Sequence, residues 1–117
     1  MVLNEASRDS IIRSTTGRGI VAPEILPYEI GNALVVARKK GRLTDHEVLR
    51  AFDSAQQIAV TLLPVAIPSA VKLAMQFGIC AYDAYYLQCC IENRLPLLSL
   101  DVRICDVAKR LRIQVVE

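Results

Sequence analysis

The sequence predicts an α/β protein with helices on both faces of a short parallel sheet, a three-layer α/β/α sandwich. Apolar residues at helical spacing alternate along the chain with short apolar segments. Those segments lack polar alternation, which is typical of parallel strands buried on both faces. The chain has 117 residues and no internal repeat or linker. We therefore expect residues 1–117 to form a single domain.

The N-terminal part is predicted to hold two helices and one strand. Residues 5–19 have the pattern of a weak helix that ends in a Gly-Arg-Gly loop. Ile20–Ala22 would form a very short strand, which Pro23 stops. Between Pro23 and Gly41, apolar residues fall on one helical face. Pro27 suits the first turn of this helix, and Gly41 suits the cap after its last turn.

The next segment is predicted to be a helix followed by a strand. Thr44 and Glu47 have the spacing of a capping box, so they should open a helix that runs to about Gln57. Val60–Val65 follows as a strand, and Pro64 places it at a strand end or a sheet edge.

The last half of the chain alternates helices with strands. We expect helices over residues 68–77, 81–93 and 101–112, and strands over residues 97–100 and 113–116. Gly78 should close the first of these helices.

Composition excludes several classes of protein. Hydrophobic residues make up 53% and charged residues 22% of the chain, which excludes a disordered protein. No apolar stretch is long enough to span a membrane, and the first residues lack the apolar core of a signal peptide. We therefore expect a soluble, cytoplasmic protein. The net charge of +2 is too small to indicate nucleic-acid binding by itself.

Several kinds of functional site have no support in the sequence. The four cysteines form no C-x-x-C pair and His46 is remote from them, which argues against a zinc site. We expect the cysteines to be buried in a protein of a reducing compartment. There is no G-x-G-x-x-G, Walker or G-x-S-x-G pattern. His46 is expected to be an exposed surface residue.

Three acidic residues are the best candidates for a site. Functional groups of parallel sheets gather beyond the carboxyl ends of the strands. Asp101 directly follows a predicted strand, Asp83 begins a helix rich in apolar and aromatic residues, and Glu29 lies early in the helix after the first strand. An acid in a first helical turn can also serve only the helix dipole. We assign that simpler role to Glu24, Asp45 and Glu47.

These three carboxylates would favour a divalent cation if they converge. No Arg or Lys in the same motifs is expected to neutralise them. Mg²⁺ binds a few carboxylate oxygens, keeps several waters and accepts substrate phosphate. Such a cluster would support attack of metal-activated water on a phosphodiester.

The chain from Ile20 onward resembles PIN-domain proteins of the VapC toxin type. The strings that carry the resemblance are Y-E-I-G-N-A-L, A-Y-D-A-Y-Y-L and, more weakly, L-S-L-D. The resemblance implies a parallel α/β/α sandwich that binds Mg²⁺ or Mn²⁺ and hydrolyses RNA. It places the family's second, third and fourth acids on Glu29, Asp83 and Asp101. Ser99 falls where the family often has a hydroxyl near the metal, and Asn32 would face the same cleft.

The resemblance also predicts a departure from the family. PIN domains begin with a central strand that ends in a metal-binding Asp, and we expect this chain to start after that strand. Asp9 does not replace the Asp, because no apolar strand precedes it. Three explanations stay open: a start set downstream of the true one, a degenerate copy, or a sheet that re-pairs or dimerises. We expect weak Mg²⁺ binding and poor RNA cleavage.

The leading hypothesis is a metal-dependent endoribonuclease that acts as the toxin of a toxin–antitoxin pair. The resemblance implies RNA as substrate, a cognate antitoxin as partner and a homodimer. RNA contacts are expected from basic residues, although these also suit helix ends: Arg38, Lys39, Lys40, Arg42, Lys109, Arg110 and Arg112. The alternative is a PIN-like module that binds an antitoxin or RNA without cleaving it. An unrelated nucleotide-binding domain has no phosphate loop to support it.

Overall fold

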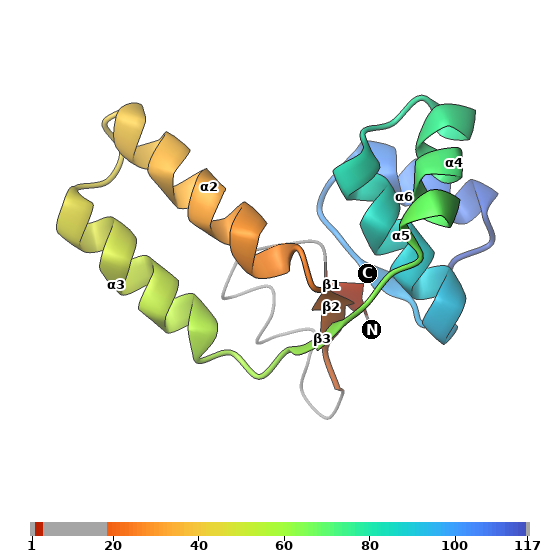
Figure 1. The fold of residues 1–117 in the computed structure, drawn as a ribbon, viewed down its shortest axis with the longest axis horizontal. Coiled ribbons are helices and arrows are strands. Elements are labelled where there is room, and N and C mark those ends of the chain that lie inside the picture. The colour runs from red at the N-terminus through yellow and green to blue at the C-terminus, as the bar shows by residue number, and fades with distance from the viewer. Residues whose placement is uncertain (1, 4–18, 117) are drawn as a thin grey trace. The chain divides into compact units, whose positions relative to one another are not determined.

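The computed structural model describes residues 2–3 and 19–116 (Figure 1). It contains four short strands and five helices in this part of the chain. In chain order the elements are β1 (Val2–Leu3), β2 (Val21–Pro23), α2 (Leu26–Lys39), α3 (Asp45–Gln56), β3 (Thr61–Leu63), α4 (Ile67–Phe77), α5 (Ala81–Asn93), β4 (Leu97–Leu98) and α6 (Val102–Arg110).

Two compact units make up the chain. The first contains all four strands together with α4, α5 and α6, and we call it the sheet unit. The second is residues 25–59, which hold α2 and α3, and we call it the helical hairpin.

The sheet is parallel throughout, with strand order β3-β2-β1-β4. Val2 of β1 is in register with Val21 on one side and with Leu97 on the other. After α6 the chain returns beside β4, where Val115 makes an isolated parallel bridge with Leu97. The predicted α/β class with a short parallel sheet is confirmed, and the arrangement is consistent with a three-layer α/β/α fold.

The expectation that the central N-terminal strand is missing from this chain is wrong. β1 lies between β2 and β4 and pairs with both. A gap at this position would leave backbone groups of two inner strands without partners, which is costly when they are buried. Two residues fill it because the neighbouring strands are themselves only two or three residues long. A strand of two residues is too short to produce a detectable period in the sequence.

The other strands also differ from their predicted limits: β3 and β4 are shorter, and β2 and the C-terminal segment depart in ways that the backbone explains. We expected Pro23 to stop the first strand, yet β2 includes it. The Thr61 amide donates to the Ile20 carbonyl and the Glu24 amide donates to the Leu63 carbonyl, both at 3.0–3.1 Å. Residues on either side of Pro23 therefore pair with β3, and the missing N–H of proline lies on the opposite edge of the strand. Residues 113–116, predicted as a strand, contribute only the bridge at Val115.

Helix α5 is the central helix of the sheet unit. It packs against β1, β2 and β4 on one side and pairs with α4 on the other. Small side chains allow α4 and α5 to approach closely, since Ala70, Ala74 and Ala84 form a buried cluster between them. Gly78 ends α4 in the left-handed conformation (φ 64°), as predicted. The predicted limits of α5 are confirmed.

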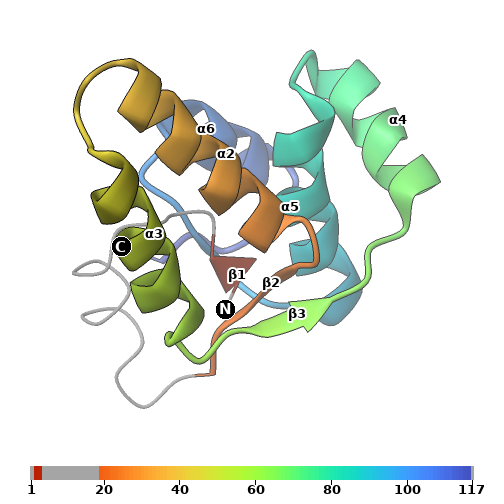
Figure 2. The same ribbon diagram turned by 60° about the vertical axis from the view of Figure 1, so that its left-hand side comes forward.

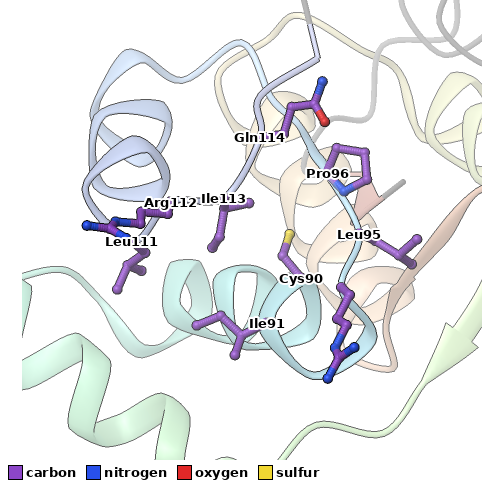
Figure 3. A pocket seen from close by; sticks show the side chains of 9 residues that line it. Cys90, Ile91, Leu95, Pro96, Leu111, Arg112, Ile113 and Gln114 are labelled. Carbon is purple, nitrogen blue, oxygen red and sulfur yellow. The ribbon is translucent and has the colours of Figure 1, made fainter.

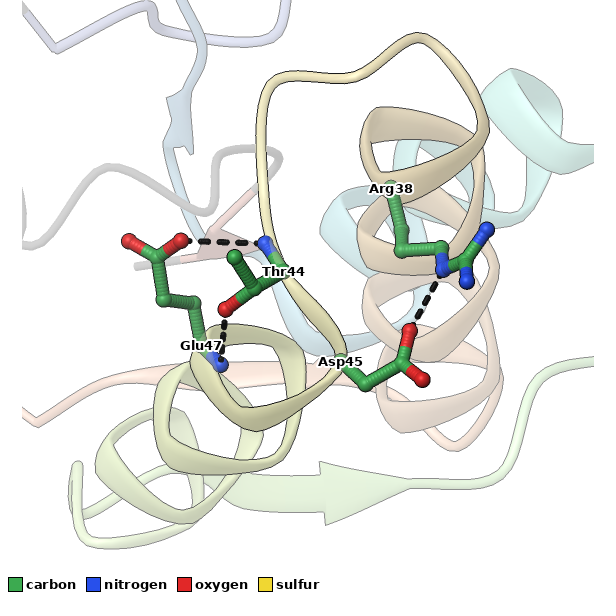
Figure 4. Close-up of polar contacts among 4 residues, drawn as sticks. All are labelled: Arg38, Thr44, Asp45 and Glu47. Carbon is green, nitrogen blue, oxygen red and sulfur yellow. Dashed lines mark hydrogen bonds and ion pairs between the residues drawn. The ribbon is translucent and has the colours of Figure 1, made fainter.

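In the helical hairpin, α2 and α3 pack side by side (Figure 2). The Thr44 hydroxyl accepts from the Glu47 amide at 3.2 Å, and the Glu47 carboxylate accepts from the Thr44 amide at 3.0 Å. This confirms the predicted capping box. Arg38 at the end of α2 forms an ion pair with Asp45 at the start of α3 (Figure 4). The connection between the helices is therefore held by polar contacts.

Within the described ranges, no helix combines the length and the apolar character needed to cross a bilayer. The weak helix predicted for residues 5–19 and the assessment of Asp9 fall largely or wholly outside those ranges.

Candidate acidic site at the carboxyl edge of the sheet

The direction of α5 brings Asp83 to the carboxyl edge of the sheet. A three-residue connection joins the end of α5 to the start of β4, so α5 runs opposite to the strands on which it packs. Its first turn, which contains Asp83, therefore lies at the edge where the parallel strands end. Ser99 and Asp101 follow β4 at this same edge. The fold thus explains how two acids 18 positions apart come to one edge.

Asp101 is the N-cap of α6 and is held by two local hydrogen bonds. One of its carboxylate oxygens, Oδ1, accepts from the Arg103 amide at 2.9 Å. Its own amide donates to the Ser99 hydroxyl at 3.1 Å. Ser99 is buried, with 7% of its surface exposed, and its carbonyl accepts from the Cys105 thiol at 3.5 Å. Ser99 therefore acts on the position of Asp101 through the backbone.

A basic side chain lies near one of these acids. We expected no Arg or Lys of the same motifs to neutralise them, and Arg103, two positions after the L-S-L-D string, places its Nε 4.0 Å from Asp101 Oδ1. The Arg103 side chain is 85% exposed, so the attraction is strongly screened by water. The capping bond explains the contact, because accepting from the amide two residues ahead brings that residue close to the carboxylate.

Asp83 lies in the first turn of α5 beside two tyrosines. Its side chain is half-buried, and the backbone N–H groups of the helix start favour its negative charge. Tyr82 and Tyr85 meet edge to face, with ring centroids 5.9 Å apart. Tyr82 is 53% exposed, whereas Tyr85 packs against the alanine cluster of α4 and α5. Asp83 is therefore at the boundary between the core and solvent.

Glu29 and Asn32 belong to α2 in the helical hairpin. Glu29 is in the first turn of α2, as predicted, and its side chain is half-buried, while Asn32 is exposed. The convergence of Glu29 with Asp83 and Asp101 stays a prediction. Among the residues that the structure describes, no group of three or more His, Cys, Asp or Glu side chains is arranged to hold a metal ion.

The donor set of the sheet unit suits a hard cation with few protein ligands. Asp83 and Asp101 offer carboxylate oxygens, which are the ligands that Mg²⁺ and Mn²⁺ prefer. Mg²⁺ is commonly held by one or two carboxylates and keeps several waters. The two acids therefore fit such an ion in kind and in number, with Oδ1 of Asp101 partly engaged by the cap.

The predictions for the cysteines and the histidine are confirmed in part. Cys89 and Cys90 are buried, and all four cysteines are free. Burial, together with the neighbouring Cys89, raises the pKa of Cys90 to about 12. Cys80, however, is exposed at the N-cap position of α5, where its side chain makes no capping hydrogen bond, and Cys105 is only partly buried. His46 is exposed on α3, as expected.

Comparison with known proteins identifies the fold and nothing finer. No family model matches the chain, and no curated protein matches it. Among solved structures, the chain is similar to the crystal structure of PAE2754 from Pyrobaculum aerophilum. The TM-score is 0.73 at 18% sequence identity, and the match covers 91% of this chain and 82% of that chain. At such low identity the likeness supports the α/β fold alone.

Sequence reasoning overlooked the cap that Asp101 provides for α6 and the position of Arg103. Both have a local signal. An Asp that directly precedes a helix is a strong N-cap candidate, and the residue two positions later then donates its amide to the carboxylate. The pocket described below carries no comparable signal, because its lining comes from segments that are distant in the sequence.

Proposed function

We propose that this protein is a divalent-metal-dependent endoribonuclease that acts as the toxin of a toxin–antitoxin pair. The observation that carries the proposal is the common location of Asp83 and Asp101 at the carboxyl edge of a parallel sheet. The family resemblance of the motifs around Glu29, Asp83 and Asp101 supplies the reaction class. The presence of the central strand β1 removes one reason to expect an inactive chain.

In this proposal Glu29, Asp83 and Asp101 hold the cation, and Ser99 keeps Asp101 in position through the Asp101 amide. Bound Mg²⁺ or Mn²⁺ supplies an activated water and neutralises charge on the phosphodiester. The protein side chains have to remain ionised, orient the cation and leave coordination positions for water and phosphate.

RNA is the proposed substrate. Lys39, Lys40 and Arg42 are exposed at the end of α2, where they are available for phosphate contacts. Two of the other basic residues have different contacts in the structure. Arg38 forms the ion pair with Asp45, and the Arg110 guanidinium lies 4.9 Å from the centre of the Phe77 ring. We therefore expect the first three to contribute more to RNA binding.

A cognate antitoxin and a second copy of the chain are the proposed protein partners. Ile67, Val71 and Met75 recur at every fourth residue along α4 and are 38–72% exposed. Such a stripe supports an apolar contact with another protein. The free state of all four cysteines supports a cytoplasmic location.

The proposal is tested by RNA cleavage with Mg²⁺ or Mn²⁺, with EDTA as the blank. Asp83→Asn, Asp101→Asn and Glu29→Gln should each lower the rate by at least about a hundredfold, since a metal site supplies several kcal/mol to the transition state. Asp106→Asn is the matched control, because Asp106 is an exposed acid of α6 outside the site.

The alternative proposal is a PIN-like module that binds RNA or an antitoxin without cleavage. The engagement of Asp101 Oδ1 by the cap and by Arg103 favours it. Retained RNA binding without metal-dependent cleavage would support this alternative. Full cleavage by both Asp83→Asn and Asp101→Asn would contradict the nuclease site proposed for these residues.

A further inference from the structure

A second feature of the sheet unit has no place in the proposed reaction. A pocket of about 400 Å³ lies between α5, the connection to β4 and the segment after α6. Figure 3 shows Cys90 and Ile91 from α5, Leu95 and Pro96 from the connection, and Leu111 and Ile113 from the later segment around it. These six side chains supply the apolar part of the lining, and the larger part of the lining surface is polar.

The pocket lies at the edge of the sheet opposite to Asp101. Its lining residues 94–96 precede β4, and residues 111–114 precede Val115, which bridges to β4. Both segments therefore meet the amino ends of the strands, whereas Asp101 follows their carboxyl ends. The pocket is a separate location on the same unit.

The polar groups of the pocket are cationic or neutral. Arg94, Arg112 and Gln114 line it, and no Asp or Glu among the described residues does. Within the described residues, neither arginine forms a salt bridge. The C-terminal ends of α5 and α6 also face this region, and each carries a partial charge of roughly −0.5. Two guanidinium charges against two such ends leave a net charge of about +1, which matches one monovalent anion.

Both arginines have an unusual backbone. Arg94 has φ 53° and Arg112 has φ 61°, and they are the only described non-glycine residues with positive φ. The left-handed conformation costs a residue with a Cβ roughly 1–2 kcal/mol, and glycine is the common solution at helix ends. Arginine stands at both of these positions, although glycine would be unstrained there. Since strained residues gather at ligand sites, this is consistent with a role for the two guanidinium groups.

We propose that this pocket binds a small aliphatic monocarboxylate. The guanidinium of arginine matches a carboxylate with paired hydrogen bonds, and the apolar side chains that form the smaller part of the lining suit an aliphatic body. The part of the chain that the structure describes places no aromatic side chain in the lining, and this lining offers no stacking surface for a nucleobase. The volume falls in the range of small-molecule sites.

Titration with sodium octanoate, followed by methyl NMR of the full chain, tests the proposal. Saturable shifts should centre on the methyl groups of Ile91, Leu95, Leu111 and Ile113. The double variant Arg94→Gln/Arg112→Gln should weaken octanoate binding by at least about tenfold. Octan-1-ol should bind the unmodified chain as weakly as octanoate binds this double variant. Lys109→Gln is the control, because it removes a nearby positive charge that does not line the pocket, and it should change the affinity less than about twofold.

Should the double Gln variant not fold, Arg94→Gly/Arg112→Gly replaces it, since glycine accepts the backbone conformation of both positions. Equal affinity for octanoate and octan-1-ol would overturn the proposal, as would unchanged octanoate binding by a folded arginine variant. Shifts confined to methyl groups outside the pocket would also overturn it. None of these outcomes depends on RNA cleavage, so the pocket and the proposed nuclease can fail separately.

Discussion

Asp101 has a structural role and a proposed chemical role, and two substitutions separate them. As the N-cap of α6 it accepts from the Arg103 amide at 2.9 Å. Replacing an N-cap Asp by Ala costs about 1 kcal/mol, whereas Asn caps nearly as well. Both substitutions also remove an interaction with the helix dipole of about 0.5 kcal/mol. The exposed contact with Arg103 at 4.0 Å adds little.

We therefore expect Asp101→Asn to lower the free energy of unfolding by about 0.5 kcal/mol and Asp101→Ala by about 1.5 kcal/mol. For a chain of 117 residues the difference corresponds to about 4 °C in Tm. Urea unfolding followed by circular dichroism measures it. Equal stability of the two variants would refute the capping role, because Asn retains the acceptor oxygen and Ala does not. In the cleavage assay both variants should be inactive despite their different stabilities.

Three further predictions concern the described side chains outside the proposed metal site. Hydrogen bonds from Thr44 lower the pKa of Glu47 below its ordinary 4.5. The stabilisation that the ionised Glu47 gives the folded state is therefore complete above pH 4.5 and is lost as the pH falls through the lowered pKa. Thr44→Ala, which costs about 1 kcal/mol, should reduce this acid dependence in urea unfolding. A thiol reagent should modify the exposed Cys80 rapidly and leave Cys90 unmodified until unfolding, because burial raises the pKa of Cys90 to about 12; modification of Cys90 at the rate of Cys80 would contradict its burial. Arg94→Gly should be more stable than Arg94→Ala by about 0.5 kcal/mol in thermal unfolding, since only glycine relieves the left-handed backbone, and the reverse order would contradict that conformation.

Local interactions explain which parts of the fold the sequence predicts. The capping box of Thr44 and Glu47 and the left-handed end at Gly78 depend on residues within one helical turn. The limits of α5 are predictable because flanking residues end its apolar run, although the helix is apolar on most sides and has only a weak period. These features need no knowledge of distant segments.

The features that the sequence does not predict depend on distant segments. β1 exists because β2 and β4 lie on either side of it, and Pro23 is accepted in β2 because β3 pairs with its neighbours. The C-terminal residues form only one bridge with β4, although their composition suits a longer strand. In each case the backbone partner decides the outcome, and the local pattern does not name that partner.

For the proposed site, too, some features are predictable from the sequence and others depend on packing. Asp83 and Asp101 reach one edge because α5 runs opposite to the strands, which follows from the order of elements along the chain. The exposure of Cys80 and the pocket between α5 and the C-terminal segment depend on packing and were not predicted. The order of the elements thus predicts which edge of the sheet holds the proposed site, whereas packing determines the surroundings of each side chain.

A double-mutant cycle tests whether Glu29 and Asp83 serve one cation. Residues that act as a unit have non-additive effects, because the first substitution already removes the function that the second would impair. If both carboxylates hold the same ion, Glu29→Gln/Asp83→Asn should cleave RNA no more slowly than Asp83→Asn alone, and Mn²⁺ binding measured by calorimetry should follow the same rule. If the two residues act independently, the losses multiply, so that two hundredfold effects become about ten-thousandfold. A multiplied loss in folded variants would contradict a shared ion and would leave Asp83 and Asp101 as the acids of the site.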